Sequence, residues 1–213
     1  MNDYYEDNQY YEIFDNIISS YNKQSDLHGI SPKGVFWQSK STQNSRFKSL
    51  LNIIHKKDYN KKFSISDFGC GYGALYSFIQ NYNFMKNCVY YGYDIVPNFI
   101  NQAQIKYPNQ NFICSEEMSI KTDYTIISGT FNYSGKIEIN RWEAYVFDSL
   151  DKCLSNSKIA MAFNLLMDKK TLIKNKLFYT SPEKISEFCK NYGETLIVKT
   201  EGAEKDMTIY VYK

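Results

Sequence analysis

Apolar residues recur at helical spacing in two stretches near the start of the chain. In the first stretch they stand three and four positions apart, which predicts an amphipathic helix over residues 3–21. In the second, the same spacing predicts a helix that starts near Ser45. Turn residues interrupt the chain over 28–37 and predict an irregular segment there. We expect residues 1–60 to form a helical cap or lid.

From residue 61 onwards, short apolar runs alternate with amphipathic stretches. The runs are typical of buried strands, and the stretches between them have helical spacing. This alternation predicts an α/β fold whose doubly wound, mostly parallel sheet has seven strands. A short polar turn joins the last two runs, which predicts an antiparallel C-terminal hairpin. The expected strands are 63–68, 89–93, 111–114, 124–128, 158–164, 195–199 and 207–212, and the expected helices are 73–82, 97–106, 141–154 and 181–192.

Composition and charge narrow the classes of function. The chain has 213 residues with 25 basic and 23 acidic side chains, for a formal net charge of +2. This balance gives no electrostatic reason to expect a nucleic-acid or membrane partner. The five cysteines are odd in number and form no metal-binding cluster, so we expect a reduced compartment and no metal. With no recognisable leader peptide or membrane span, we expect a soluble, cytoplasmic protein.

The stretch from Ser64 to Leu75 carries the clearest chemical signal. A predicted strand runs directly into three alternating glycines, Gly69, Gly71 and Gly73, and then into a predicted helix. Glycine lets the backbone turn sharply and approach a ligand with no Cβ in the way. The next strand ends in Asp94, where an acid can accept hydrogen bonds from ribose hydroxyls. These two strand ends predict a site for a nucleoside cofactor.

The glycine loop by itself fits two kinds of cofactor. Gly69, Gly71 and Ala74 also satisfy G-x-G-x-x-G/A, the pattern that binds the pyrophosphate of dinucleotides. Asp67, however, places a carboxylate beside the position of that pyrophosphate, and a carboxylate suits a cationic ligand better. The chain before the loop is also too short for a separate catalytic domain. Both observations favour a cationic nucleoside cofactor over a nicotinamide.

The order of these features resembles the class I methyltransferases, which use S-adenosylmethionine. The shared features are D-x-G-x-G-x-G, an acid that ends the second strand, an acidic loop after the third strand and a closing hairpin. The resemblance implies a Rossmann-like methyltransferase domain over residues 61–213. It also implies that Asp67 and the glycines face the methionine part, Asp94 the ribose and Ser128 the transferable methyl. The cofactor-binding residues that it implies are Trp37, Arg46, Asp67, Gly69, Gly71, Gly73, Asp94, Ile95, Glu116, Glu117 and Ser128.

Five members of that set have structural alternatives. Asp94 either accepts the ribose hydroxyls or is the N-cap of the next helix, and both roles can coexist. Trp37 is either an aromatic lid over the cofactor or core packing for the N-terminal helices. Arg46 either binds the methionine carboxylate or pairs with a carboxylate of the protein. Glu116 and Glu117 either edge the adenine or are solvated loop acids. The sequence leaves these alternatives open.

A narrower resemblance reaches into the N-terminal cap. The segments HGISPKGVFWQSKSTQNSRF, YTIISGTFN, MAFNLL and LFYTSPEKISEFCK resemble small bacterial methyltransferases of saccharide and secondary-metabolite gene clusters. In that likeness Asn132 and Asn164 match polar residues at the ends of strands four and five, and we expect them to orient the methyl acceptor. His28 and Asn132 are the candidate catalytic residues, although a loop histidine such as His28 can also be merely solvated. The closing turn, residues 201–206, departs from the pattern of the group.

We therefore expect a methyltransferase that transfers a methyl group to oxygen or nitrogen of a small molecule by in-line displacement. Two alternatives remain: a methyltransferase of RNA or protein, and a non-catalytic, partner-binding protein of the same fold. No arginine-rich arm is present, since Arg46 and Arg141 are the only arginines, so a nucleic-acid substrate is not expected. The sequence predicts no oligomeric state.

Overall fold

The structure is a computed structural model that describes residues 9–200, 203 and 205–213. The strands are β1 (Phe63–Phe68), β2 (Cys88–Asp94), β3 (Asn111–Cys114), β4 (Thr122–Ile127), β5 (Ser157–Met167), β6 (Leu172–Lys174), β7 (Leu177–Thr180), β8 (Glu194–Lys199) and β9 (Asp206–Tyr212). The α-helices are α1 (Tyr11–His28), α2 (Lys40–Leu51), α3 (Ala74–Ile79), α4 (Pro97–Lys106), α5 (Ile139–Asn156) and α6 (Pro182–Cys189). Short 3-10 helices are η2 (Lys33–Val35), η3 (Lys56–Asp58) and η4 (Asn83–Met85).

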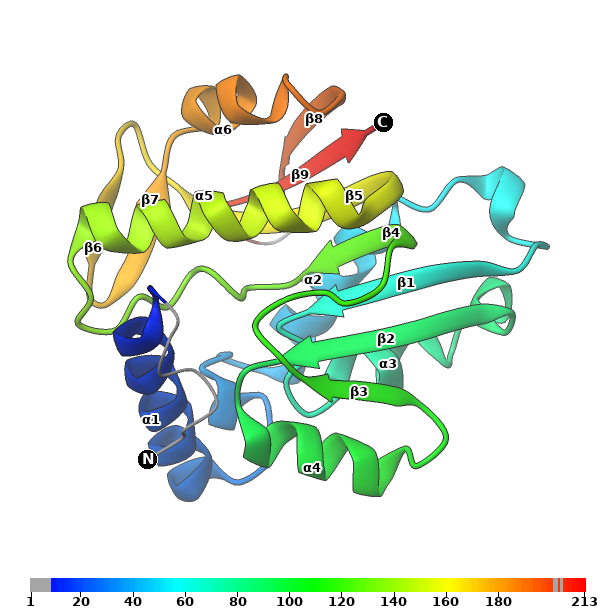
Figure 1. Ribbon diagram of the computed structural model, residues 1–213, viewed down its shortest axis with the longest axis horizontal. Helices are drawn as coiled ribbons and strands as arrows, with labels where there is room; N and C mark the ends of the chain where they lie inside the picture. Colours follow the sequence, from blue (N-terminus) through cyan, green and yellow to red (C-terminus); the bar gives the residue numbers. More distant parts are fainter. Residues whose placement is uncertain (1–8, 201–202, 204) are drawn as a thin grey trace.

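The sheet is parallel over five neighbouring strands and then branches at β5. Its order is β3-β2-β1-β4-β5, with every one of these pairs parallel. Strand β5 is long enough for two partners: Ala160 to Leu166 pair antiparallel with β9, and Leu166 and Met167 pair in parallel with β7. Strand β8 completes the C-terminal hairpin beside β9 (Figure 1). The predicted α/β fold, with its mostly parallel sheet and antiparallel C-terminal hairpin, is confirmed.

Strands β6 and β7 were not predicted, and in the described residues the sheet has nine strands rather than seven. They pair antiparallel around Asn175 and Lys176, whose φ angles of 53° and 65° make a two-residue turn. Hairpin turns with two positive φ angles usually carry glycine. Because this turn has none, the sequence gives little sign of the hairpin.

The N-terminal helices α1 and α2 do not begin and end where the apolar spacing predicts. Helix α1 continues to His28 and ends at Gly29, whose φ angle of 68° breaks the helix; residues 3–8 of its predicted span lie outside the described residues. Helix α2 begins directly after Ser39, earlier than predicted, because Ser39 and Thr42 form a reciprocal capping box. The polar first turn of α2 has no apolar spacing, so the pattern alone does not reveal it.

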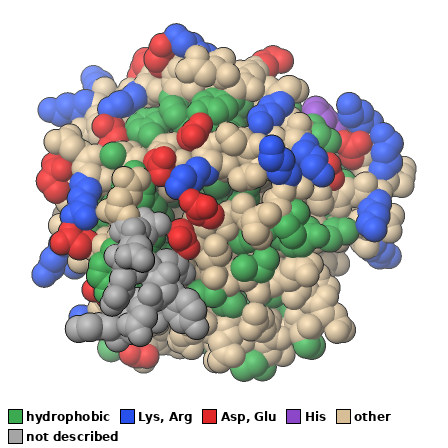
Figure 2. All heavy atoms as spheres, viewed as in Figure 1, with side chains coloured by type: hydrophobic (Ala, Val, Ile, Leu, Met, Phe, Trp, Pro, Cys, Tyr) green, Lys and Arg blue, Asp and Glu red, His purple; other side chains and the backbone are tan. Residues whose placement is uncertain are grey.

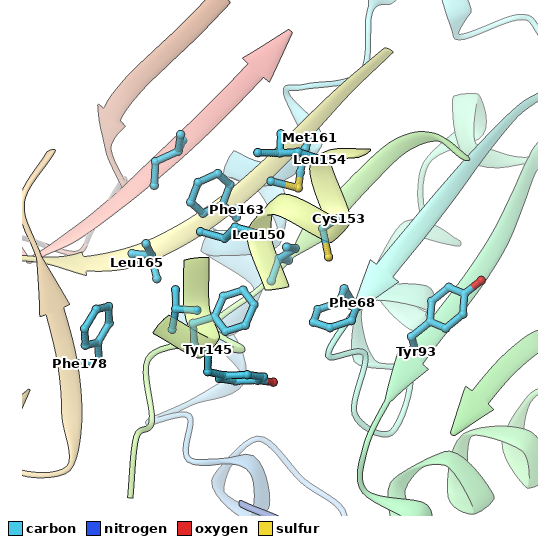
Figure 3. Close-up of a cluster of buried hydrophobic side chains, with 14 of the residues drawn as sticks. Phe68, Tyr93, Tyr145, Leu150, Cys153, Leu154, Met161, Phe163, Leu165 and Phe178 are labelled. Atoms are coloured by element: carbon cyan, nitrogen blue, oxygen red, sulfur yellow. The ribbon is translucent and has the colours of Figure 1, made fainter. Parts of the chain in front are cut away.

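Each face of the sheet has its own hydrophobic core. In β5, Phe163 and Leu165 belong to the core on one face, together with Leu150 and Leu154 of α5 (Figure 3). Ala162, which directly precedes Phe163, belongs to the core on the opposite face, where α2 packs. This alternation follows from the two-residue period of a strand. Helices therefore cover both faces of the sheet. A polar ligand can reach the sheet only at the edge where the strands end.

Helix α1 lies across the carboxyl ends of β1 and β2 (Figure 1). In a doubly wound sheet, a crevice forms at these ends where the chain order reverses, here between β1 and β4. Apolar residues of α1, among them Ile13 and Phe14, belong to the same core as Phe131, which follows β4. Helix α1 is thereby held against the segment that follows β4.

Across the described chain, no helix combines the length and apolar character needed to cross a membrane. On the face shown in Figure 2, basic and acidic side chains lie among one another. No disulfide joins any of the five cysteines, all of which lie in the described part of the chain.

Candidate cofactor-binding site

A cavity of about 420 Å³ lies at the carboxyl ends of β1, β2 and β4. The ends of these strands line one side of it. Residues of α1, of the segment 35–38 and of α2 line the other. Ligands of doubly wound sheets usually bind at this switch point, and the volume is in the range of small-molecule sites.

The glycine loop after β1 presents bare backbone to the cavity. Gly69, Gly71 and Gly73 have φ angles of 77°, 54° and 80°, in the left-handed region that favours glycine. A Cβ at Gly69 would come within 2.2 Å of the Thr130 hydroxyl, whereas a Cβ at Gly71 would meet nothing within 4 Å. Gly69 is thus required for packing, and Gly71 leaves open space at the cavity. Gly73 is the N-cap residue of α3 and does not line the cavity.

The carboxylate of Asp94 ties the end of β2 to the glycine loop. One oxygen accepts a hydrogen bond from the backbone N–H of Gly71 at 2.8 Å, and the other accepts one from Val96 at 2.8 Å. Burial raises the pKa of Asp94 to about 6, although these backbone N–H groups act in the opposite direction. Each oxygen keeps a lone pair for a further donor. Asp94 and its neighbour Ile95 both line the cavity.

Asp67 lines the cavity as a buried carboxyl group that is only 1% exposed. Its Oδ2 accepts a hydrogen bond from the hydroxyl of Tyr90 at 2.5 Å. Burial raises the pKa of Asp67 to about 7; the bond from Tyr90 lowers it and nearby Asp94 raises it further. A cationic ligand would stabilise the charged form of both acids.

Ser128 directly follows β4 and lines the same cavity as these acids. Its hydroxyl is buried and has no hydrogen-bond partner among the described residues. A buried polar group without a partner is rare in folded proteins. The orphaned hydroxyl therefore marks a place where a polar ligand group fits.

Arg46 and Trp37 form the opposite wall. Arg46 forms the carboxylate pair that its structural alternative predicts, whereas Trp37 belongs to neither hydrophobic core. Nε of Arg46 lies 2.8 Å from Oδ2 of Asp206. The Arg46 guanidinium lies 4.7 Å from the centre of the Trp37 ring. The Trp37 ring covers Gly129, because a Cβ at that glycine would come within 2.7 Å of it. Both side chains also line the cavity, so a structural role and a ligand contact are compatible.

The two residues expected to orient the methyl acceptor, Asn132 and Asn164, differ in their position relative to the cavity. Asn132 lines the cavity, and its Oδ1 accepts a hydrogen bond from the backbone N–H of Leu166 at 3.2 Å. Asn164 is buried away from the cavity. Its Oδ1 accepts a bond from the Gly129 N–H at 2.9 Å, and its Nδ2 donates to Asp206. Asn164 thus holds the turn on which Trp37 rests.

Three further candidates do not line the cavity. His28 is exposed at the C-terminal end of α1. Glu116 and Glu117 follow β3, and Glu117 forms an exposed ion pair with Lys152 at 2.7 Å. Their neighbour Ser115 does line the cavity.

The sequence analysis missed the aromatic part of the lining. Tyr21, Phe36, Tyr133 and Tyr145 all line the cavity. These residues come from α1, the segment after η2, the segment after β4, and α5. Their spacing in sequence resembles that of core packing, and only the richness of the chain in tyrosine could have drawn attention to them.

Comparisons with solved structures define the class of this fold. A methyltransferase dependent on S-adenosylmethionine from Leishmania major superposes with a TM-score of 0.69 at 12% identity, over 94% of this chain and 82% of that one. The plantazolicin methyltransferase BpumL, solved with S-adenosylhomocysteine, gives 0.62 at 13% identity, over 95% and 96% of the two chains. Streptomyces venezuelae DesVI gives 0.59 at 7% identity, over 91% and 98%. The chain therefore has the class I methyltransferase fold.

A relative found by sequence agrees with this class. The Mycobacterium tuberculosis protein named "Putative methyltransferase Rv1506c" is 29% identical over 169 residues, which cover 76% of this chain and 99% of that protein. No family model matches the chain. The likeness to class I methyltransferases is thus confirmed, and the narrower likeness to enzymes of saccharide gene clusters stays a prediction.

Proposed function

We propose that this protein is an S-adenosylmethionine-dependent methyltransferase that acts on a small molecule. One observation carries the proposal: a methyltransferase fold places a bare glycine loop and two carboxylates, Asp67 and Asp94, in one cavity. Two buried carboxylates favour a positively charged sulfonium compound and disfavour the pyrophosphate of a dinucleotide.

The residues that line the cavity suit three parts of S-adenosylmethionine: the methionine part, the ribose and the reacting end. Asp67 and the loop 69–73 would hold the methionine part. Asp94, beside Ile95, would accept the ribose hydroxyls through lone pairs that its two backbone bonds leave available. The orphaned hydroxyl of Ser128 would find a partner at the reacting end.

The cover of the site is proposed to be the N-terminal cap of residues 1–60. Arg46 is the candidate partner of the methionine carboxylate, with Asp206 holding its Nε. Trp37 would close the cavity over the cofactor. For the adenine edge, Ser115 is a better candidate than Glu117, which pairs with Lys152.

When bound, the cofactor supplies a methyl group on a positively charged sulfur that is already activated for displacement. The protein has to align the acceptor and exclude water. We assign the alignment to Asn132, because it lines the cavity and the backbone N–H of Leu166 fixes its Oδ1. Asn164 supports the site indirectly by holding Gly129. His28 receives no role here, because it is exposed outside the cavity.

The two alternatives predict other properties. A methyltransferase of RNA would need a basic surface around the site, whereas the net charge is +2 and the face in Figure 2 mixes both signs. A non-catalytic protein of this fold would have no reason to keep the glycine loop and both carboxylates. The intact site favours an enzyme.

Calorimetric titration with S-adenosylmethionine, S-adenosylhomocysteine and NAD⁺ tests the cofactor. We expect the first two to bind and NAD⁺ not to bind. Incubation with methyl-labelled cofactor and a cell extract, separated into small molecules, RNA and protein, tests the substrate class. Label in RNA or protein would support those alternatives, and binding without transfer would support the non-catalytic one. No binding of either sulfur compound at millimolar concentration would overturn the proposal.

A further inference from the structure

Part of the cavity lining is aromatic and carries no charge. Tyr21, Phe36 and Tyr133 form one cluster there: the rings of Phe36 and Tyr133 stack with centres 4.3 Å apart. The Tyr21 ring stands at 80° to Phe36 and at 77° to Tyr133. Tyr145 and Asn132 also belong to this part of the lining. We call these five residues the acceptor wall.

The charged side chains of the cavity leave it with a net negative charge. Among the described lining residues, the charged ones are Arg46, Asp67 and Asp94. The charge of Arg46 is matched by Asp206, 2.8 Å away. Neither Asp67 nor Asp94 has a cationic partner among the described residues. The field in the cavity therefore disfavours an anionic acceptor such as a carboxylate or phosphate.

The acceptor wall offers no group that could take up a proton. Histidine, lysine and glutamate are absent from the described lining of the cavity. Burial, with a smaller contribution from nearby Asp94, raises the pKa of Tyr21 far above its usual value, and burial does the same for Tyr145. These phenols stay protonated, and the two carboxylates are assigned to the cofactor. An alcohol, which must lose a proton as it is methylated, would find no base at the wall.

Building on the proposed function, we infer that the methyl acceptor is an uncharged amine nitrogen of a small molecule, bound against the acceptor wall. The nitrogen lone pair forms the new bond to the methyl carbon as the carbon–sulfur bond breaks, and the electrons of that bond stay on sulfur. The amine becomes a methylammonium, which carries the positive charge away; the proton that an ammonium substrate has to lose passes to water before the transfer. Positive charge moves from sulfur to nitrogen, and aromatic rings and a negative cavity stabilise it at both positions.

The charge of the product gives a test that needs no knowledge of the natural acceptor. Choline, 3,3-dimethylbutan-1-ol and 3,3-dimethylbutanoate share a branched head of similar shape and are cationic, neutral and anionic. Each is titrated calorimetrically into protein saturated with S-adenosylhomocysteine. We expect choline to bind about tenfold more tightly than the neutral alcohol, and the anion to bind most weakly.

Matched variants separate the acceptor wall from the general field of the cavity. Phe36→Leu and Tyr133→Leu are expected to weaken choline binding about three- to tenfold without changing the affinity for S-adenosylhomocysteine, which also reports folding. Phe84→Leu is the control, because Phe84 stacks on Tyr59 at 4.0 Å outside the cavity. The inference is overturned by absent choline binding, by equal or tighter binding of the alcohol or anion, or by unchanged choline affinity in both variants. Failure of the wild type to bind S-adenosylhomocysteine would instead overturn the proposed function.

Discussion

Arg46 and Asp206 stand 160 residues apart in the chain, yet Nε of Arg46 lies 2.8 Å from Oδ2 of Asp206. Asp206 is only 1% exposed and also accepts hydrogen bonds from Thr200 at 2.5 Å and from Asn164 at 3.3 Å. On the other side, the Arg46 guanidinium covers the ring of Trp37. Asp206 of the C-terminal hairpin thus fixes Arg46, and through it Trp37, at the wall of the cavity.

Replacing Asp206 is expected to cost both stability and ligand binding. Asp206→Ala leaves the Arg46 guanidinium and the Asn164 amide without their buried partner. Breaking a buried ion pair from one side typically costs about 3–5 kcal/mol, which urea unfolding measures. The affinity for S-adenosylhomocysteine should fall as well, because Trp37 and Arg46 lose their anchor.

Arg141 provides the matched control, as the other arginine of the chain. It pairs with Glu12 on the surface, where both side chains are largely exposed. Exposed pairs contribute little, so Arg141→Ala should change the free energy of unfolding by less than about 1 kcal/mol. Equal effects of the two variants would contradict the anchoring role of Asp206.

Asp94→Asn is expected to weaken cofactor binding with little effect on folding of the sheet. An amide can accept only through its oxygen, so its NH₂ group must face the N–H of either Gly71 or Val96. Loss of one charge-assisted bond and of the charge itself should lower the affinity for S-adenosylmethionine about 10- to 100-fold, measured by calorimetry. Asp123→Asn is the control: Asp123 also accepts two bonds, both from Ser64, outside the cavity. A similar loss in both variants would argue against a site at Asp94.

Gly69 and Gly71 should respond differently to alanine. Gly69→Ala places a Cβ within 2.2 Å of the Thr130 hydroxyl, besides the positive φ angle, and should destabilise the fold by at least about 2 kcal/mol. Gly71→Ala meets no neighbour and costs only about 1 kcal/mol for its φ angle. Its methyl group should nevertheless hinder a cofactor at the cavity. Urea unfolding and calorimetry together separate the two effects; full cofactor affinity in Gly71→Ala would contradict the placement.

Because the pKa of Asp67 is raised, we expect its contribution to the free energy of unfolding to decrease as pH rises. Its pKa is raised from 3.8 to about 7 in the folded protein by burial, so between these values the folded state binds more protons than the unfolded state. This contribution is fully present below pH 4 and is lost as pH rises through about 7. Asp67→Asn removes it while keeping an oxygen for the Tyr90 hydroxyl. Between pH 5 and pH 8 the wild type should lose about 2 kcal/mol relative to the variant in urea unfolding; parallel pH profiles would contradict this.

The stretches that were predicted closely are those whose conformation is encoded locally. Strand β1 and helix α4 have the predicted bounds, since Pro97 starts α4 and glycines follow β1 directly. Ser181 caps α6 as its sequence indicates, with Pro182 in the first turn. The end of helix α1 could not be predicted in this way. Its last turns are polar, and packing against the segment after Gly29 keeps them helical beyond the predicted end.

By itself, the sequence determined the class of fold and the chemistry of the cofactor loop. The glycines that need positive φ angles directly follow one strand, and Asp94 ends the next strand 23 residues after Gly71, so each feature can be read from a short stretch of sequence. The tertiary structure alone decided which distant side chains share the cavity. It joined Arg46 to Asp206, turned Asn164 toward Gly129 and gathered Tyr21, Phe36 and Tyr133 into one wall. Such contacts depend on how whole layers pack, and an aromatic residue that lines a cavity has the same local pattern as one that fills a core.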